Sequence, residues 1–309
     1  MKKIRTFSSR RTLIYPQSKI GLVIGKGADL PKEIIEKHQI EIISYKADWP
    51  EVEGLPGENI FQKMREAEKK EIKTFVKTSQ PSPKVFLDAY KKQLEKFENV
   101  FCITLTSKLS GTYNSAIQAK NFLKPQNQER VFVVDSLNVS GGQALLAFRL
   151  FDLINEGEKT MKEIKKELEE LRSKINCRVI FKDPKWVEAA GRMSPTIANW
   201  VRRMEKVGIR PLIGIKDGLL KPVGIKTGAK DIVIALFKEI KEKTRKLRNQ
   251  NKKIRVIITH GDDVKAAQRL KDMIEKELEG GEVLFINILN DIIGTLAGPD
   301  ALILSWIEG

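Results

Sequence analysis

The chain has 309 residues, 41% of them hydrophobic and 31% charged, and its 56 lysines and arginines against 40 aspartates and glutamates give a formal net charge of +16. This length favours two domains, and the composition excludes a wholly disordered chain. No apolar run approaches the ~20 residues that a membrane-spanning helix needs. The nearest such run, residues 292–307, is interrupted by glycine, proline and aspartate.

The positive charge makes nucleic acid the first partner to consider. The basic residues are nevertheless spread along the chain and mixed with glutamates, and the densest stretch, 238–255, has the pattern of a helix. A solvated basic helix face is therefore the favoured interpretation. An acidic protein, an anionic lipid surface and nucleic acid are the alternatives, and nucleic acid rests on charge alone.

Two cysteines, Cys102 and Cys177, lie in strand-like runs and are typical of buried reduced thiols, so a cytoplasmic protein is expected. Neither a metal nor a cofactor is expected. The histidines and cysteines are scattered, and the glycine-rich segment 21–27 has the wrong spacing for a phosphate-binding loop. Residues 1–18 are basic and lack the apolar segment of a secretory signal, which predicts a flexible extension.

Short apolar runs alternate with helical segments from residue 19 to residue 156. This alternation predicts an α/β domain with a parallel sheet and helices on its faces. Strands are expected at 19–24, 40–44, 100–105 and 131–135, helices from 31 onward and at 58–70, 82–97, 112–122 and 141–155, and loops at 47–57 and 77–82.

The pattern changes in residues 157–309, which we expect to form a second α/β domain. Asp217-Gly218 separates two strand-like runs, 210–216 and 219–226, and is a strong hairpin signal. A hairpin requires antiparallel pairing, so the second sheet should be mixed or antiparallel. Helices are expected at 161–175 and are expected to begin at 195 and at 264. Strands are expected at 178–181 and 283–289, and another strand is expected to end at residue 260.

Two hydroxyl-rich loops are the main candidates for a binding site. One carries Thr78 and Ser79, and the other carries Thr106, Ser107 and Ser110 directly after a predicted strand. Ligands of open α/β sheets bind beyond the carboxyl ends of the strands, where hydroxyls suit an anionic head group. Turn formation and helix capping are the alternative roles for these hydroxyls. No matched acid, base and nucleophile can be named, so we do not expect an enzyme.

Several sequence blocks together resemble the DegV family after residue 18. They are Ala28-Asp29-Leu30-Pro31, Thr78-Ser79-Gln80-Pro81-Ser82, Ser107-Lys108-Leu109-Ser110-Gly111-Thr112-Tyr113, Val133-Val134-Asp135-Ser136, Gly191-Arg192-Met193-Ser194, Ile209-Arg210-Pro211 with Asp217-Gly218, and Gly298-Pro299. The resemblance implies a two-domain fold that holds one long-chain fatty acid between its domains. It also implies that the protein presents the carboxylate to a separate fatty acid kinase, with Thr78 and Ser107 holding that carboxylate.

The chain departs from the family pattern at two positions. Gly25 stands where the family usually has an aspartate, and Leu296 stands where it usually has a histidine. Lys26 would then either replace the lost donor or point into solvent. Arg192 has two alternative roles: it would contact the carboxylate or a partner kinase, or it would donate to loop carbonyls. An enzyme that acts on a small anionic substrate in the same cleft remains the alternative function.

Overall fold

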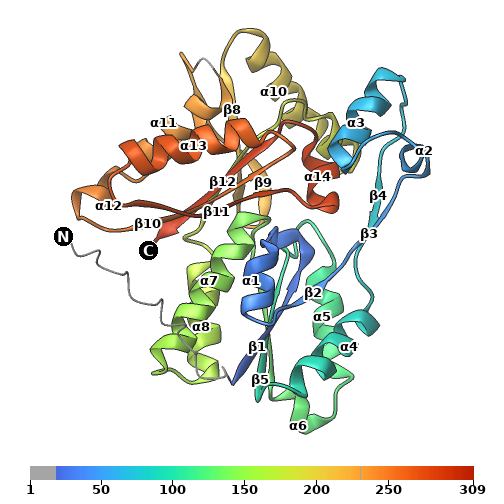
Figure 1. The fold of residues 1–309 in the computed structure, drawn as a ribbon, viewed down its shortest axis with the longest axis vertical. Helices are drawn as coiled ribbons and strands as arrows, with labels where there is room; N and C mark the ends of the chain where they lie inside the picture. The colour runs from blue at the N-terminus through green and yellow to red at the C-terminus, as the bar shows by residue number, and fades with distance from the viewer. Residues whose placement is uncertain (1–18, 230) are drawn as a thin grey trace, which may run out of the picture.

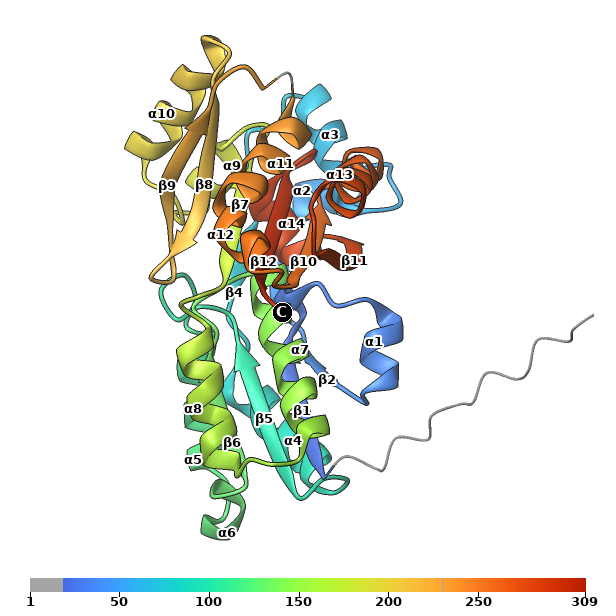
Figure 2. The same ribbon diagram turned by 90° about the vertical axis from the view of Figure 1, so that its left-hand side faces the viewer.

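The computed structural model describes residues 19–229 and 231–309, so the predicted extension 1–18 lies outside the described residues. The described chain forms two lobes, each built around its own sheet (Figures 1 and 2). Within this part of the chain, no helix is both long and apolar enough to cross a membrane.

The first lobe contains a four-stranded parallel sheet in the order β2-β1-β5-β6, as the alternating pattern predicted. Alternate residues of a strand face opposite sides, so Val23 packs with one set of helices while Leu22 and Ile24 pack with the other. Helices α4 and α5 cover the first face, and α7 and α8 cover the second. The elements are β1 (Ile20–Gly25), η1 (Lys26–Ala28), α1 (Lys32–Lys37), β2 (Glu41–Ile43), α4 (Pro83–Leu94), β5 (Asn99–Thr104), α5 (Thr112–Asn121), α6 (Pro125–Gln128), β6 (Val131–Asp135), α7 (Gly141–Glu156) and α8 (Met161–Leu171).

The second lobe contains a six-stranded mixed sheet in the order β11-β10-β12-β7-β8-β9. Only β10 and β11 are parallel, and β8 and β9 form the predicted hairpin, with Asp217 and Gly218 both at positive φ. Helices α11 and α13 pack on one face, and α9, α10 and α14 pack on the other. The elements are β7 (Asn176–Ile180), α9 (Lys185–Ala189), α10 (Pro195–Lys206), β8 (Arg210–Lys216), β9 (Leu219–Lys226), α11 (Ile232–Lys243), α12 (Arg245–Asn249), β10 (Ile254–His260), α13 (Val264–Glu277), β11 (Gly281–Ile288), α14 (Asp291–Ala297) and β12 (Leu302–Glu308).

A short antiparallel ribbon connects the lobes where the sequence predicted loops. Strand β3 (Lys46–Asp48) pairs with β4 (Lys77–Ser79), and the chain between them forms α2 (Pro50–Glu53) and α3 (Ile60–Lys69). This excursion leaves the first sheet and lies beside α14 of the second lobe (Figure 1). Arg65 of α3 holds this excursion against the second lobe through ion pairs to Asp262 at 2.6 Å and Asp300 at 2.5 Å.

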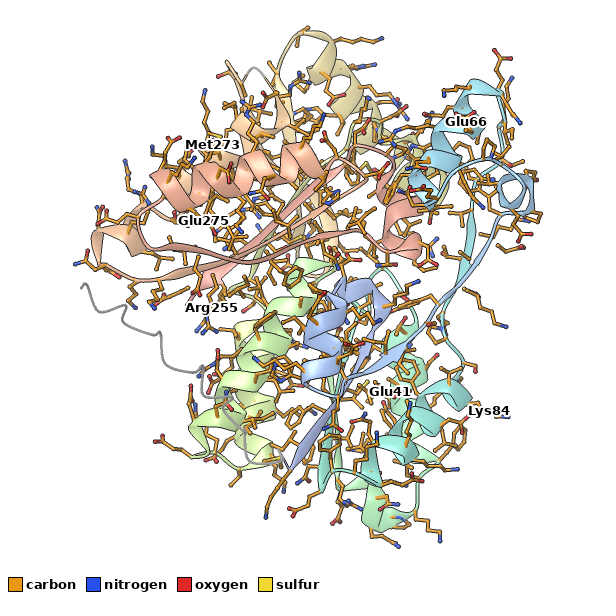
Figure 3. The ribbon with its side chains drawn as sticks, viewed as in Figure 1. Glu41, Glu66, Lys84, Arg255, Met273 and Glu275 are labelled. Atoms are coloured by element: carbon orange, nitrogen blue, oxygen red, sulfur yellow. The ribbon has the colours of Figure 1, made fainter. Side chains whose placement is uncertain are left out.

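The predicted domain boundary at 156/157 stays a prediction, and α8, the helix that follows it, lies beside the first sheet. Helix α8 packs through Ile164 and Leu168 in the same core cluster as the first sheet, so the second sheet begins only at β7. Helix α7 also reaches both lobes, because Asp152 pairs with Arg255 of β10. Arg255 lies at the junction of the lobes in Figure 3.

Asp29 links the lobes through a buried polar network. One carboxylate oxygen accepts from Ser140 Oγ at 2.6 Å, and the other accepts from the backbone N–H of Asn290 at 2.7 Å and from its side chain at 2.5 Å. Ser140 Oγ also lies 2.7 Å from the hydroxyl of Thr259 in the second sheet. Burial raises the pKa of Asp29 to about 6, and the bonds from Ser140 and Asn290 only partly oppose this effect.

We expect Asp29→Asn to change how stability depends on pH. Because the folded pKa of Asp29 lies above its ordinary value of 3.8, the folded protein holds this proton between pH ~4 and ~6 while the unfolded chain does not. The wild type therefore loses a contribution as pH rises through this window, amounting to ~3 kcal/mol at most. Asparagine carries no such proton, and it also tolerates the positive φ of position 29.

The measurement is the free energy of unfolding of both proteins by urea denaturation at pH 4 and pH 7. The variant should gain stability relative to the wild type as the pH increases. A difference between the two proteins that stays constant across this range would contradict the assignment.

Candidate functional site

A pocket lies between the two lobes, with an empty volume of about 760 Å³ that includes the space opening to solvent. Its lining is mostly apolar, with polar groups contributed by the segments around β4, Ser110 and Arg192. The lining residues are Tyr45, Thr78, Ser79, Gln80, Leu105, Leu109, Ser110, Val139, Val179, Phe181, Val187, Arg192, Leu220, Ile292, Ile293, Leu296, Ala297 and Ile303.

The β3–β4 ribbon and the loop after β5 bring hydroxyls to the pocket. Thr78 and Ser79 lie on β4, and Ser110 ends the loop before α5. The Ser110 and Thr112 hydroxyls lie 2.6 Å apart, so each hydroxyl helps to fix the orientation of the other. Gln80 lies across Gly111, where a Cβ would come within 1.7 Å of the Gln80 side-chain oxygen. A larger residue at position 111 would therefore displace the Gln80 side chain, which donates to Ser115 at 3.2 Å.

Arg192 adds a positive charge beside these hydroxyls. It follows a turn at Gly191, which has a φ of +71°. One guanidinium nitrogen donates to Thr78 Oγ1 at 3.4 Å, and the other donates to the carbonyl of Ala190. Across residues 19–229 and 231–309, no carboxylate forms an ion pair with Arg192. A partly buried cation beside an apolar pocket, without an anion of its own, is suited to an anionic ligand.

Helix α14 forms much of the apolar wall. Ile292, Ile293, Leu296 and Ala297 all line the pocket. Asn290 begins the helix, because its side-chain oxygen accepts from the backbone N–H groups of Ile292 and Ile293 at 2.8 and 3.2 Å. The Asp29 network holds this same residue. Leu296 therefore extends the apolar surface at the position where the family pattern has a histidine.

The other three predicted site residues do not line the pocket. Thr106 is buried and donates to the carbonyl of Gly218 at 3.0 Å, at the tip of the β8–β9 hairpin. The backbone N–H of Ser107 donates to Asp135 at 3.1 Å, and the Lys26 ammonium pairs with Asp291 at 2.8 Å. The part that these three residues take in ligand binding stays a prediction.

Several lining residues were not found from the sequence. Tyr45 lies next to a segment that was predicted to be a loop, and the α14 residues lie in the run that most resembled a membrane segment. The apolar side chains of α14 were the available signal, but nothing local indicated which surface they would face. Among the described residues, no group of three or more histidine, cysteine, aspartate or glutamate side chains is arranged to hold a metal ion.

Comparison with known proteins places this fold in a family. The model of the family described as "Uncharacterised protein, DegV family" matches residues 19–309. A fatty acid-binding protein of Thermotoga maritima is 30% identical over 291 residues, which cover 91% of this chain and 95% of that protein. A DegV domain-containing protein of Clostridium acetobutylicum is 31% identical over 265 residues, covering 84% and 89% of the two chains.

Solved structures agree with this assignment. A stearic acid-binding protein of Eubacterium ventriosum superposes with a TM-score of 0.77 at 22% identity, covering 94% of this chain and 98% of that one, and shares the fold. A Thermotoga maritima protein whose structure reveals a fatty acid binding function has a TM-score of 0.70 at 27% identity, covering 94% and 100%. The predicted resemblance is thus confirmed, and the chain belongs to the DegV family.

Proposed function

We propose that the protein binds one long-chain fatty acid in the pocket between its lobes. The observation that carries the proposal is the pairing of an apolar wall with an unpaired cation, Arg192, beside the hydroxyls of Thr78, Ser79 and Ser110. The carboxylate would lie at this polar end and the tail along α14 and the second sheet. The fatty acid-binding relatives support the same ligand class.

The two ends of the ligand contribute to binding in different ways. Burying the ~14 methylenes of a sixteen-carbon acid contributes ~11 kcal/mol gross. Association costs roughly 4–15 kcal/mol. The tail therefore supplies most of the affinity, and the polar end selects and orients the carboxylate. This division explains how binding tolerates a leucine at position 296.

We further propose that the protein is a carrier in the reducing cytoplasm. It presents the fatty acid to a kinase and is not itself the catalyst. Ser79 and Gln80 are exposed, so the polar end of the pocket is accessible to a partner. The buried thiols Cys102 and Cys177 are unpaired, as suits a reducing compartment. An enzyme that acts on a small anionic substrate is the competing function. Arg192 could bind the charge of such a substrate, but the apolar wall, which forms most of the lining, would have no apolar group to contact.

Loading and phosphorylation test this role. Mass spectrometry of an organic extract of the purified protein should find a long-chain fatty acid, and delipidated protein should take up palmitate at micromolar concentrations. With a DegV-dependent fatty acid kinase and ATP, the loaded protein should support acyl phosphate formation. Failure to take up palmitate would overturn the ligand, whereas uptake without acyl phosphate would overturn only the kinase role.

We expect Thr78→Ala combined with Ser110→Ala to lower palmitate affinity about tenfold, because hydrogen bonds to a charged carboxylate are lost. The fold should persist, since neither hydroxyl lies in a core cluster. Ser107→Ala is the matched comparison, and isothermal titration with palmitate is the measurement. If Ser107→Ala lowers palmitate affinity more than the double variant does, the carboxylate is bound by Ser107, the other hydroxyl that the family resemblance indicated.

We expect Arg192→Met to weaken palmitate binding about tenfold or more and to remove most of its salt dependence, because the variant keeps the stem and deletes the unpaired charge. Lys26→Met is the control. It also removes a cation near the pocket, but one that Asp291 already neutralises, so affinity should not change. Titrations at low and high salt compare the two variants, and equal losses would contradict the special position of Arg192.

A further inference from the structure

Tyr45 lines the polar end of the pocket, and the sequence did not indicate it. It directly precedes β3, whose pairing with β4 sets Lys46 opposite Ser79, so the tyrosine lies beside the Thr78-Ser79-Gln80 segment. Its ring is partly accessible, but its hydroxyl oxygen Oη is buried. The tyrosine therefore presents a ring to the pocket and a hydroxyl to the interior.

This hydroxyl has no hydrogen-bond partner of good geometry among the described residues. Thr112 lies close enough for its hydroxyl to oppose the rise in the Tyr45 pKa, but Thr112 is already engaged with Ser110. Tyr90 provides the contrast, because its buried hydroxyl donates to the carbonyl of Ala116 at 3.1 Å. A buried polar group without a partner is costly, so its presence calls for a role.

A Cβ at position 25 would overlap the space that Tyr45 Oη occupies. Gly25 has φ −70° and ψ 144°, which any residue adopts, so its backbone does not require glycine. A Cβ there would lie 2.2 Å from Tyr45 Oη, 3.1 Å from Cζ and 3.3 Å from Cε2. Glycine 25 and tyrosine 45 therefore act as a pair, in which the hydroxyl takes the place of a side chain on residue 25.

We propose that the Tyr45 hydroxyl positions the donor that selects an ionised carboxylate: with a ligand bound, Tyr45 donates to Thr112, Thr112 donates to Ser110, and Ser110 donates to the carboxylate. This inference rests on the proposed fatty acid function. Burial raises the pKa of Tyr45, mainly by desolvation, so the phenol stays neutral and keeps the proton that it donates. The hydroxyls of Thr112 and Ser110 continue from it toward the pocket and complete a polar end that donates to one anion.

The test compares ligands that share a tail and differ in the head group, namely palmitate and hexadecanol. Tyr45→Phe should lower palmitate affinity about tenfold or more while changing hexadecanol affinity less than threefold, because a neutral alcohol gains less from the donor. Tyr113→Phe is the matched control, since it removes the same atom from a tyrosine that does not line the pocket, and it should leave both affinities unchanged.

Gly25→Ala provides a second, independent test of the pair. Its Cβ should displace Oη, so it should lower palmitate affinity as Tyr45→Phe does and also lower the melting temperature. In the Tyr45→Phe background no hydroxyl lies 2.2 Å from the new Cβ. The ring then needs to move away by only a few tenths of an ångström. The same alanine should then cost less stability and add almost no further loss of affinity.

The possible outcomes separate the two levels of inference. If the wild type binds palmitate and Tyr45→Phe binds it equally well, the role of Tyr45 is wrong and the fatty acid function stands. If the wild type binds neither ligand, the fatty acid function itself fails. Additive losses from Gly25→Ala and Tyr45→Phe would show that the two residues act separately and would overturn their pairing.

Discussion

The structure depends on one buried carboxylate, that of Asp29, which connects the lobes between which the pocket lies. Its oxygens accept from Ser140 in the first lobe and from Asn290 in the second, and Ser140 in turn contacts Thr259 of the second sheet. Asn290 is also the residue that begins α14. The position of the apolar wall is thus set by a hydrogen bond from the opposite lobe. A charge buried in this way is costly unless it is fully bonded, so the lobes have little freedom to separate at this point.

The pocket combines an apolar surface made by the core with a polar surface made by connecting segments. The apolar wall consists of side chains that belong to a large core cluster between α14, α9 and the second sheet. The polar end consists of segments outside the two large sheets, namely the β3–β4 ribbon, the loop before α5 and the turn at Arg192. Because the ribbon also carries α3, which is bonded to Asp262 and Asp300, the hydroxyls of Thr78 and Ser79 are held relative to the second lobe as well as the first.

The strong positive charge of the chain is best understood residue by residue. Lys26, Arg65 and Arg255 have carboxylate partners, as do many other cations of the described chain. Paired charges on the surface contribute little to stability or to recognition. Arg192 differs because its side chain reaches a carbonyl and a hydroxyl instead of a carboxylate. One unpaired cation beside an apolar cavity carries more information about the ligand than the net charge does.

The sequence by itself determined the elements whose signals are local and the family to which the chain belongs. Alternating and continuous apolar runs located β1, β5 and β6, and the Asp217-Gly218 pair located the β8–β9 hairpin, because turn geometry depends on neighbouring residues. Only the tertiary structure decided which surfaces meet. Strand β12 is buried on both faces between β10 and β7, so its apolar run has no period of two and can equally be taken for a helix. The meeting of Arg192 with Thr78, of Lys26 with Asp291 and of Tyr45 with Gly25 joins segments that no local pattern connects. Such contacts arise from how the elements pack, and packing is a property of the whole chain.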